Sequence, residues 1–321
     1  MKRHLALFLV AAVVWAGVPA VLAQPAGPPA AAPESWVPDW RAWFAPREMP
    51  APVALQTAVA HGDSGEVRRM LEAGADPNGT ADSSATPLQV AILNGRGDLA
   101  QILLEHGADP GLTTAGTPDP PLNLAVRRRD EPLTRLLLAH GAPVEAAGPR
   151  FLATPFAQLG DTPLHEAAES GDAVLTALLL DQGAGPNTGN RAGLTPLHHA
   201  VGGGHLDVAA QLLAGGAALE QRSRIGATPL HWAAVQGQVE AVRALLERGA
   251  KVNTRTRNGS TPLHSAVARH EAELVELLLA HGADPTAIGL TGKTPLGIAR
   301  REGDAELIRL LEAAAEPSPS P

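Results

Sequence analysis

The chain has 321 residues, a formal net charge of −8 at pH 7 and no cysteine. The missing cysteines exclude disulfide bonds, thiol catalysis and cysteine metal sites, and the acidic balance argues against general nucleic-acid binding. Aromatic residues make up only 3% of the chain, so we expect a core of leucine and alanine.

Residues 1–23 have the pattern of a secretory signal peptide. A basic start at Lys2 and Arg3 precedes an apolar stretch, 5–18, and small residues lie before a cut at Gln24. The alternative is an uncleaved membrane anchor, but the apolar stretch is shorter than the roughly 20 residues that span a bilayer. We therefore expect export to a bacterial periplasm or, as the second choice, secretion.

Residues 24–51 are expected to form a proline- and alanine-rich linker and then a tryptophan-rich segment. Trp36, Trp40 and Trp43 recur at helical spacing. Because the terminal units of a repetitive domain need a modified outer face, we interpret this segment as an N-terminal cap. The alternative is an aromatic peptide that docks on a partner.

One tetrad, Thr-Pro-Leu-His, recurs every 33 residues in the second half of the chain. It starts at Thr162, Thr195, Thr228 and Thr261, and the copy at Thr294 has glycine in place of histidine. Thr can cap a helix and Pro fits the first helical position. His at the third position can reach back to the cap, as Glu or Gln does in a capping box. We therefore predict that each tetrad opens a helix and that its His has a structural role.

Each 33-residue unit is predicted to hold two helices and an extended loop, which we call the finger. After Thr162, a short helix with an apolar side ends at Gly171. A second helix has leucines at spacings of three and four, beginning with Leu175, and ends before Gly183. Residues 184–194 are rich in Gly, Asn and Pro and lead to the next tetrad, so they form the finger.

This order closely resembles the ankyrin repeat, whose 33-residue period and Thr-Pro-Leu-His-x-Ala signature it matches. His165-Glu166-Ala167 and His231-Trp232-Ala233 carry even the trailing alanine. The resemblance covers residues 52–316 and implies an all-α ankyrin-repeat solenoid of about eight helix-turn-helix repeats with extended fingers. It also implies a protein-binding module rather than an enzyme. Residues 317–321 are expected to be a disordered tail.

The third repeat departs from the pattern. Pro120 replaces the threonine, Asn123 replaces the histidine, and the finger between Gly141 and Pro163 is longer than the others. Insertions in repeat arrays map to loops on one face, which is often the binding face. The candidate partner contacts in this long finger are Arg150, Phe151 and Phe156.

The repeats contain only weak sequence signals for a catalytic or metal site. His165 and Glu166 begin a run that is one residue short of a zinc-protease helix, because Glu169 replaces the second histidine. Histidines of stacked repeats lie roughly 8–10 Å apart, whereas zinc lies about 2 Å from each imidazole nitrogen. We therefore expect no enzyme activity, no metal and no cofactor. A hydrolase, the alternative, would lose activity when His165 or Glu166 is changed.

Arginines form a ladder along the predicted fingers. Arg191, Arg224 and Arg257 are 33 residues apart at one position, and Arg222 and Arg255 are 33 residues apart at another. Exposed fingertips are often simply polar, but arginine pairs well with carboxylates and is enriched at interfaces. The ladder therefore predicts a partner protein with an acidic surface.

Further candidates lie on the first helices. The resemblance implies that the ends of these helices and the fingers line a concave binding surface, which would include Arg127, Arg128 and Arg269. Trp232 could be an aromatic anchor for the partner or could pack between repeats. We expect a monomer that binds one protein. Exported ankyrin proteins of similar build include immunity proteins that neutralise a secreted toxin. The alternative is a scaffold or chaperone for a periplasmic enzyme such as catalase.

Overall fold

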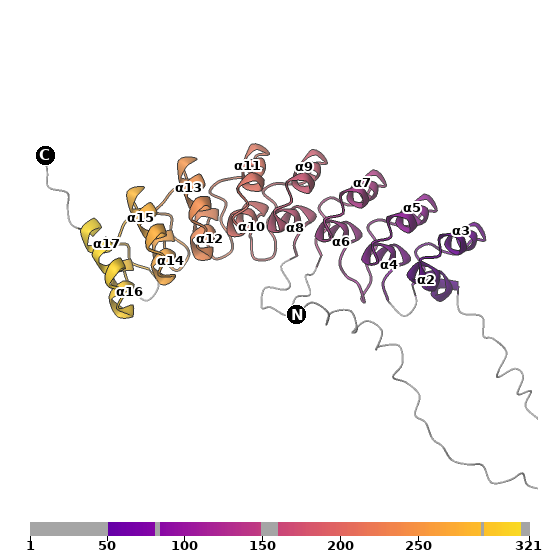
Figure 1. Cartoon of the computed structure of the whole chain (residues 1–321), viewed down its shortest axis with the longest axis horizontal. Helices are drawn as coiled ribbons and strands as arrows, with labels where there is room; N and C mark the ends of the chain where they lie inside the picture. Colours follow the sequence, from indigo (N-terminus) through magenta and orange to yellow (C-terminus); the bar gives the residue numbers. More distant parts are fainter. Residues whose placement is uncertain (1–50, 81–83, 149–159, 290–291, 316–321) are drawn as a thin grey trace, which may run out of the picture. The chain divides into compact units, whose positions relative to one another are not determined.

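The computed structural model describes residues 51–80, 84–148, 160–289 and 292–315. In these ranges the chain folds into eight helix pairs that follow one another in a row (Figure 1). The predicted all-α solenoid is confirmed. The predicted leader, the linker with its tryptophans and the predicted tail lie outside the described residues. No helix in the described ranges is long and apolar enough to cross a membrane.

Each pair has a first helix, which follows a finger, and a second helix, which precedes the next finger. The first helices are α2 (Ala51–His61), α4 (Pro87–Leu93), α6 (Pro121–Arg127), α8 (Pro163–Ser170), α10 (Pro196–Gly202), α12 (Pro229–Gln236), α14 (Pro262–Ala268) and α16 (Pro295–Glu302). The second helices are α3 (Ser64–Glu72), α5 (Gly97–Glu105), α7 (Glu131–Ala139), α9 (Ala173–Asp181), α11 (Leu206–Ala214), α13 (Val239–Glu247), α15 (Ala272–Ala280) and α17 (Ala305–Ala315).

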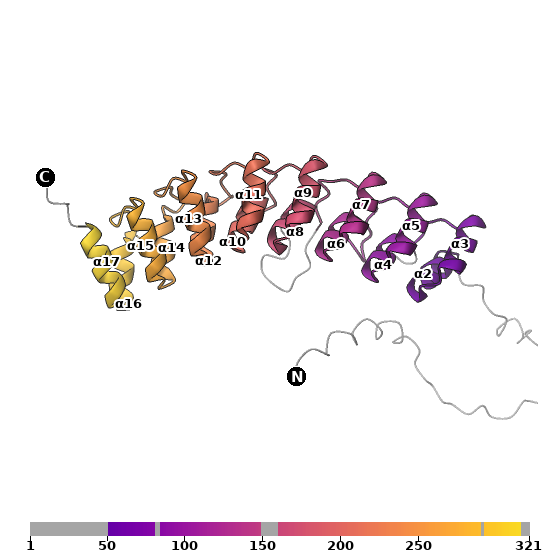
Figure 2. The ribbon, with the colours of Figure 1, turned by 45° about the horizontal axis from the view of Figure 1, so that its top comes forward.

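The core is the set of surfaces between neighbouring repeats. First helices pack on first helices and second helices on second helices, so the pairs lie side by side in both views (Figures 1 and 2). The tetrad leucines are fully buried there, and each contributes about 1.5–3 kcal/mol through burial. They are Leu164, Leu197, Leu230 and Leu263.

The helix starts confirm the predicted use of the tetrads. In α8, α10, α12 and α14 the threonine is the N-cap, proline follows it, and threonine and histidine form a reciprocal capping box. Thr86 and Gln89 form the same box in α4. Gly171 ends α8 in the left-handed conformation, as predicted. The capping residues thus set the start of these five first helices.

Candidate protein-interaction surface

The tetrad histidines are fully engaged in holding the stack together. In His231, Nδ1 accepts a hydrogen bond from the backbone N–H of Thr228 at 3.2 Å. Its Nε2 donates to the carbonyl oxygen of Ser260 in the following finger, also at 3.2 Å. His165, His198 and His264 make the same pair of bonds. Each imidazole therefore joins its own helix start to the next finger.

Burial keeps these imidazoles neutral. It lowers the pKa of His198 and His231 to about 4 and lowers that of His165 and His264 as well. A carbonyl can only accept, so the proton sits on Nε2 and Nδ1 is the acceptor. Within the described ranges, no group of three or more histidines and carboxylates could hold a metal ion.

His165 and Glu166, the residues that a hydrolase would use, both make structural contacts. Glu166 is only 4% exposed and pairs with Arg127 at 2.9 Å. Arg127 also pairs with Asp119 at 3.0 Å. Burial disfavours the charge on Arg127, but the hydrogen bonds to Glu166 and Asp119 outweigh it and raise its pKa. Because His165 caps a helix and Glu166 neutralises an arginine, this geometry gives both residues structural roles.

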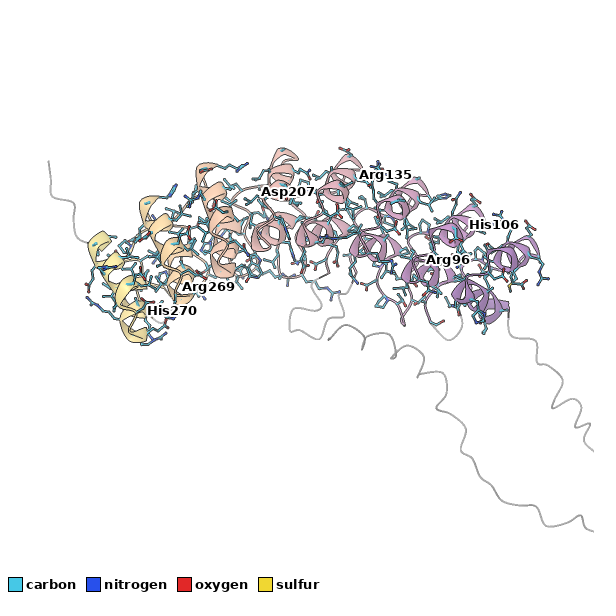
Figure 3. All side chains as sticks on the ribbon, in the orientation of Figure 1. Arg96, His106, Arg135, Asp207, Arg269 and His270 are labelled. Atoms are coloured by element: carbon cyan, nitrogen blue, oxygen red, sulfur yellow. The ribbon has the colours of Figure 1, made fainter. Side chains whose placement is uncertain are left out.

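The predicted arginines at the first-helix ends also bind within the stack. Arg128 donates to the carbonyl oxygen of Leu93 at 2.9 Å, and Arg269 donates to that of Val235 at 3.1 Å. In both cases the acceptor lies near the end of the preceding first helix. Figure 3 labels Arg269 beside His270, just after α14. These side chains are exposed, but part of their donor capacity is used between repeats.

The arginine ladder of the fingers divides into two sets. Arg222 donates to the carbonyl oxygen of Arg255, and Arg255 donates to that of Ile288 at 2.5 Å. These guanidinium groups link one finger to the next. Arg224 and Arg257 bind the preceding finger through their backbone N–H groups, at 2.8 and 2.9 Å. Their exposed side chains make no ion pair with any carboxylate in the part of the chain that the structure describes.

Two exposed isoleucines of the fingers were not among the contact residues predicted from the sequence. Ile225 is 61% exposed and Ile288 is 59% exposed, more than any other large apolar residue in the described ranges. Ile225 follows Arg224 directly, and the backbone of Ile288 accepts the hydrogen bond from Arg255. An apolar residue in a polar loop is the signal that could have found them.

The remaining predicted partner contacts are Trp232, Arg191 and three residues of the long finger. Trp232 is half-buried and lies over Gly202 of the preceding repeat, where a Cβ atom would come within 2.6 Å of the indole. This is packing between repeats, one of the two roles that the sequence left open for Trp232. Arg191 is exposed at its predicted finger position. Arg150, Phe151 and Phe156 lie outside the described residues.

The two ends of the long third finger meet. The backbone N–H of Gly148 donates to the carbonyl oxygen of Asp161 at 3.3 Å, and Asn123 donates to the same oxygen at 2.9 Å. The insertion therefore leaves and re-enters the stack at one place, so it does not shift the repeats that flank it.

Two family models match the chain. One is described as ankyrin repeats in three copies and matches residues 51–114 and 164–256; the other is described as ankyrin repeats in many copies and matches residues 245–299. The stretch between 114 and 164, which holds the irregular third repeat, is unmatched. No curated protein matches the chain. The matched segments together span more than half of the chain, which therefore belongs to the ankyrin-repeat family, whose members typically bind other proteins without catalysis.

Proposed function

We propose that this chain binds an acidic surface of another protein through the fingers of its middle repeats and has no catalytic role. The observation that carries the proposal is the pair Arg224 and Arg257. Both guanidinium groups are exposed without an ion-pair partner in the described ranges, while their backbones are fixed by hydrogen bonds to the preceding fingers. The backbone at both positions is already ordered, so only the arginine side chains lose conformational freedom when they meet a carboxylate.

The distribution of charge supports this choice of surface. Acidic residues dominate the later second helices, for example Glu240 and Glu247 in α13 and Glu273 and Glu276 in α15. The ladder arginines lie in the fingers instead. A protein with this separation of charge attracts an acidic partner toward its fingers and repels it from its second helices.

We further propose that the chain acts in the bacterial periplasm as an immunity protein that neutralises a secreted toxin. The basic and apolar pattern of residues 1–23 supports export. The arginine ladder fits a toxin with an acidic face. Export is tested by fractionation of cells that produce the full chain: a shortened chain in the periplasmic fraction supports it, and a full-length chain in the cytoplasm contradicts it.

Partner binding is tested by affinity capture from periplasmic extract, followed by measurement of the dissociation constant. The double variant Arg224→Glu/Arg257→Glu should weaken the complex at least tenfold, which corresponds to about 1.4 kcal/mol. The control Arg68→Glu/Arg309→Glu makes the same charge change at two exposed residues of α3 and α17 and should bind like the wild type. Equal affinities for all three proteins would remove the fingers from the proposal.

A complex that abolishes the activity of the captured protein supports immunity. A complex that leaves a captured enzyme active would instead support the scaffold alternative.

A further inference from the structure

The outer side of the second helices carries an open groove of about 350 Å³ at the fourth repeat. It lies on the edge where Figure 3 labels Arg135. Five of its lining residues come from α9, and the others are Arg135 of α7 and Gln211 of α11. The five are Ala173, Val174, Ala177, Leu178 and Asp181.

The groove lies where α9 departs from the pattern of most other second helices, because the small residue Ala177 lines it. At the fifth helical position, Ala177 of α9 and Ala210 of α11 stand alone in being small. The other six repeats carry a long polar side chain there: Arg68, Gln101, Arg135, Arg243, Glu276 and Arg309. Among the eight repeats, only the two adjacent central ones, the fourth and the fifth, have a small residue at this position.

A second departure exposes an apolar side chain at the rim. The second position of these helices is acidic in five repeats, where a carboxylate favours the helix N-terminus. Those residues are Asp98, Asp207, Glu240, Glu273 and Glu306. In α9 this position is Val174, which is 53% exposed. The fourth repeat therefore gives up a favourable charge and presents an aliphatic surface.

The carboxylates in and beside the groove favour a cationic ligand. Asp181 lies at its rim, and Asp207 is exposed on the neighbouring helix. The one cation, Arg135, already pairs with Glu131 at 2.8 Å. A guanidinium next to an aliphatic side chain would pair with Asp181, while the aliphatic part would cover Val174.

The chain itself carries such a segment at the tip of its fifth finger. Ile225 is 61% exposed, and the adjacent Arg224 has no carboxylate partner in the described part. The tip is held by the bond from the Arg224 N–H to the Ala192 carbonyl and by that from the Arg257 N–H to the Ile225 carbonyl. It is therefore a rigid, basic and aliphatic knob.

We propose that the Arg224-Ile225 fingertip of one copy docks in the α9 groove of a second copy. Ile225 packs on Val174, and the Arg224 guanidinium donates to the Asp181 carboxylate. Knob and groove are different surfaces of the same chain, so the contact is heterologous and can extend to short oligomers. Its small area makes it weak and reversible.

The proposal rests on the fingers that the proposed function also uses, but it adds a second surface that partner binding does not need. The partner and the second copy would compete for the same fingertip. Changes in the groove should therefore abolish self-association and leave partner binding intact, which keeps the two ideas separable.

Sedimentation velocity of the full chain, from micromolar to millimolar concentration at low ionic strength, tests the contact. The wild type should show a sedimentation coefficient that rises with concentration, and added salt should suppress the rise. Val174→Asp and Ile225→Asp should each weaken association at least tenfold. A mixture of these two variants should form a one-to-one pair, because each keeps the half that the other has lost.

Two matched variants control for the added charge. Leu93→Asp places it at another exposed apolar residue, and Asn258→Asp places it at the same tip position of the next finger. Both should associate like the wild type. A wild type that stays monomeric at millimolar concentration would overturn the proposal. So would association that survives both Val174→Asp and Ile225→Asp, or folded variants whose mixture fails to pair.

Discussion

At the scale of single residues, the tetrad histidine links two repeats because its two ring nitrogens have opposite roles. Nδ1 accepts from the helix start, and Nε2 donates to a carbonyl 29 residues further on, as His198 does to Ala227. Gln89 makes the same two bonds without an ionisable ring. Its Oε1 accepts from the backbone N–H of Thr86, and its Nε2 donates to the carbonyl oxygen of Thr117. A side chain with one acceptor and one donor makes both bonds, whereas Gly297 stands at this position in the last repeat.

The histidines make the fold sensitive to acid. In the unfolded chain they bind protons with an ordinary pKa of 6.5, whereas in the fold the pKa of His198 and His231 is about 4. Their full contribution to stability is present above pH 6.5 and is lost as the pH falls toward 4, because the unfolded chain then binds more protons. The loss is about 3 kcal/mol at most for each residue. Urea unfolding at pH 7.5 and pH 4.5 measures it.

The matched variant is His198→Gln/His231→Gln, which keeps a donor and an acceptor and removes the titration. It should lose less stability than the wild type between the two pH values. An equal loss in both proteins would show that other groups carry the acid sensitivity.

The capping bond of each tetrad histidine was predictable from the sequence, and its bond to the next finger was not. Thr, Pro and His within four residues predict the cap from local geometry alone. The bond to the next finger depends on how far apart stacked repeats lie, which no single repeat specifies. The third repeat shows the dependence on local chemistry: Pro120 has no N–H to offer, and the Oδ1 atom of Asn123 is buried without a partner in the described part.

The turn between the two helices of a repeat gives a second prediction. Arg129 and His270 have φ values of 56° and 59° there, although the left-handed region favours glycine. Arg129 makes no side-chain bond in the described part, so Arg129→Gly should raise the free energy of unfolding by about 1 kcal/mol. The other six repeats have glycine in this turn: Gly62, Gly95, Gly171, Gly204, Gly237 and Gly303.

His270→Gly is the contrasting variant. Its ring lies 3.0 Å from Glu302 and 2.9 Å from Asp304, and the hydrogen bond to Asp304 raises its pKa. Removing the ring relieves the same strain but breaks both contacts, so the gain should be smaller than for Arg129→Gly at pH 6. A larger gain for His270→Gly would contradict this account of the turn.

At the scale of elements, the third repeat shows how the stack tolerates an insertion. Its finger was predicted to be long from the spacing of Gly141 and Pro163, but the sequence could not show that its ends are joined. The Gly148–Asp161 bond and the Asn123 side chain close the loop at its base. Arg127 then clamps the repeat to α8 through Glu166.

Deletion of residues 150–158 tests this closure. The shortened chain should keep the melting temperature of the wild type, because the bonds at the base remain. It should also bind the partner more weakly, if the predicted contacts of Arg150, Phe151 and Phe156 hold. A large fall in melting temperature would show that the inserted residues support the fold, and unchanged binding would remove them from the interaction surface.

At the scale of the whole molecule, stability passes from each repeat to its neighbours. The last pair, α16 and α17, covers α14 and α15, and Leu307 and Leu311 are fully buried. Removing residues 294–321 should therefore lower the melting temperature and promote aggregation through the uncovered apolar surface. Removing only 316–321 is the control and should change neither. Equal melting temperatures for the two truncations would contradict coupling between neighbours.

The period of 33 residues predicted the architecture, because every unit repeats the same caps, leucines and glycines. It also predicted that arginines gather on the fingers. It could not separate Arg222 and Arg255, which bind the next finger, from Arg224 and Arg257, which point to solvent. That division depends on the offset between stacked fingers. The groove beside Val174 depends in the same way on the spacing of stacked second helices, because residues of three repeats line it.

The central claim is that the fingers of the middle repeats contact the partner. A photocrosslinking residue at position 224 or 257 tests it directly, with one at position 276 of α15 as the control on the second helices. In periplasmic extract, the two finger positions should yield a covalent adduct with one partner protein, identified by mass spectrometry, and position 276 should yield none. Adducts that form at position 276 and not at the fingers would contradict the account.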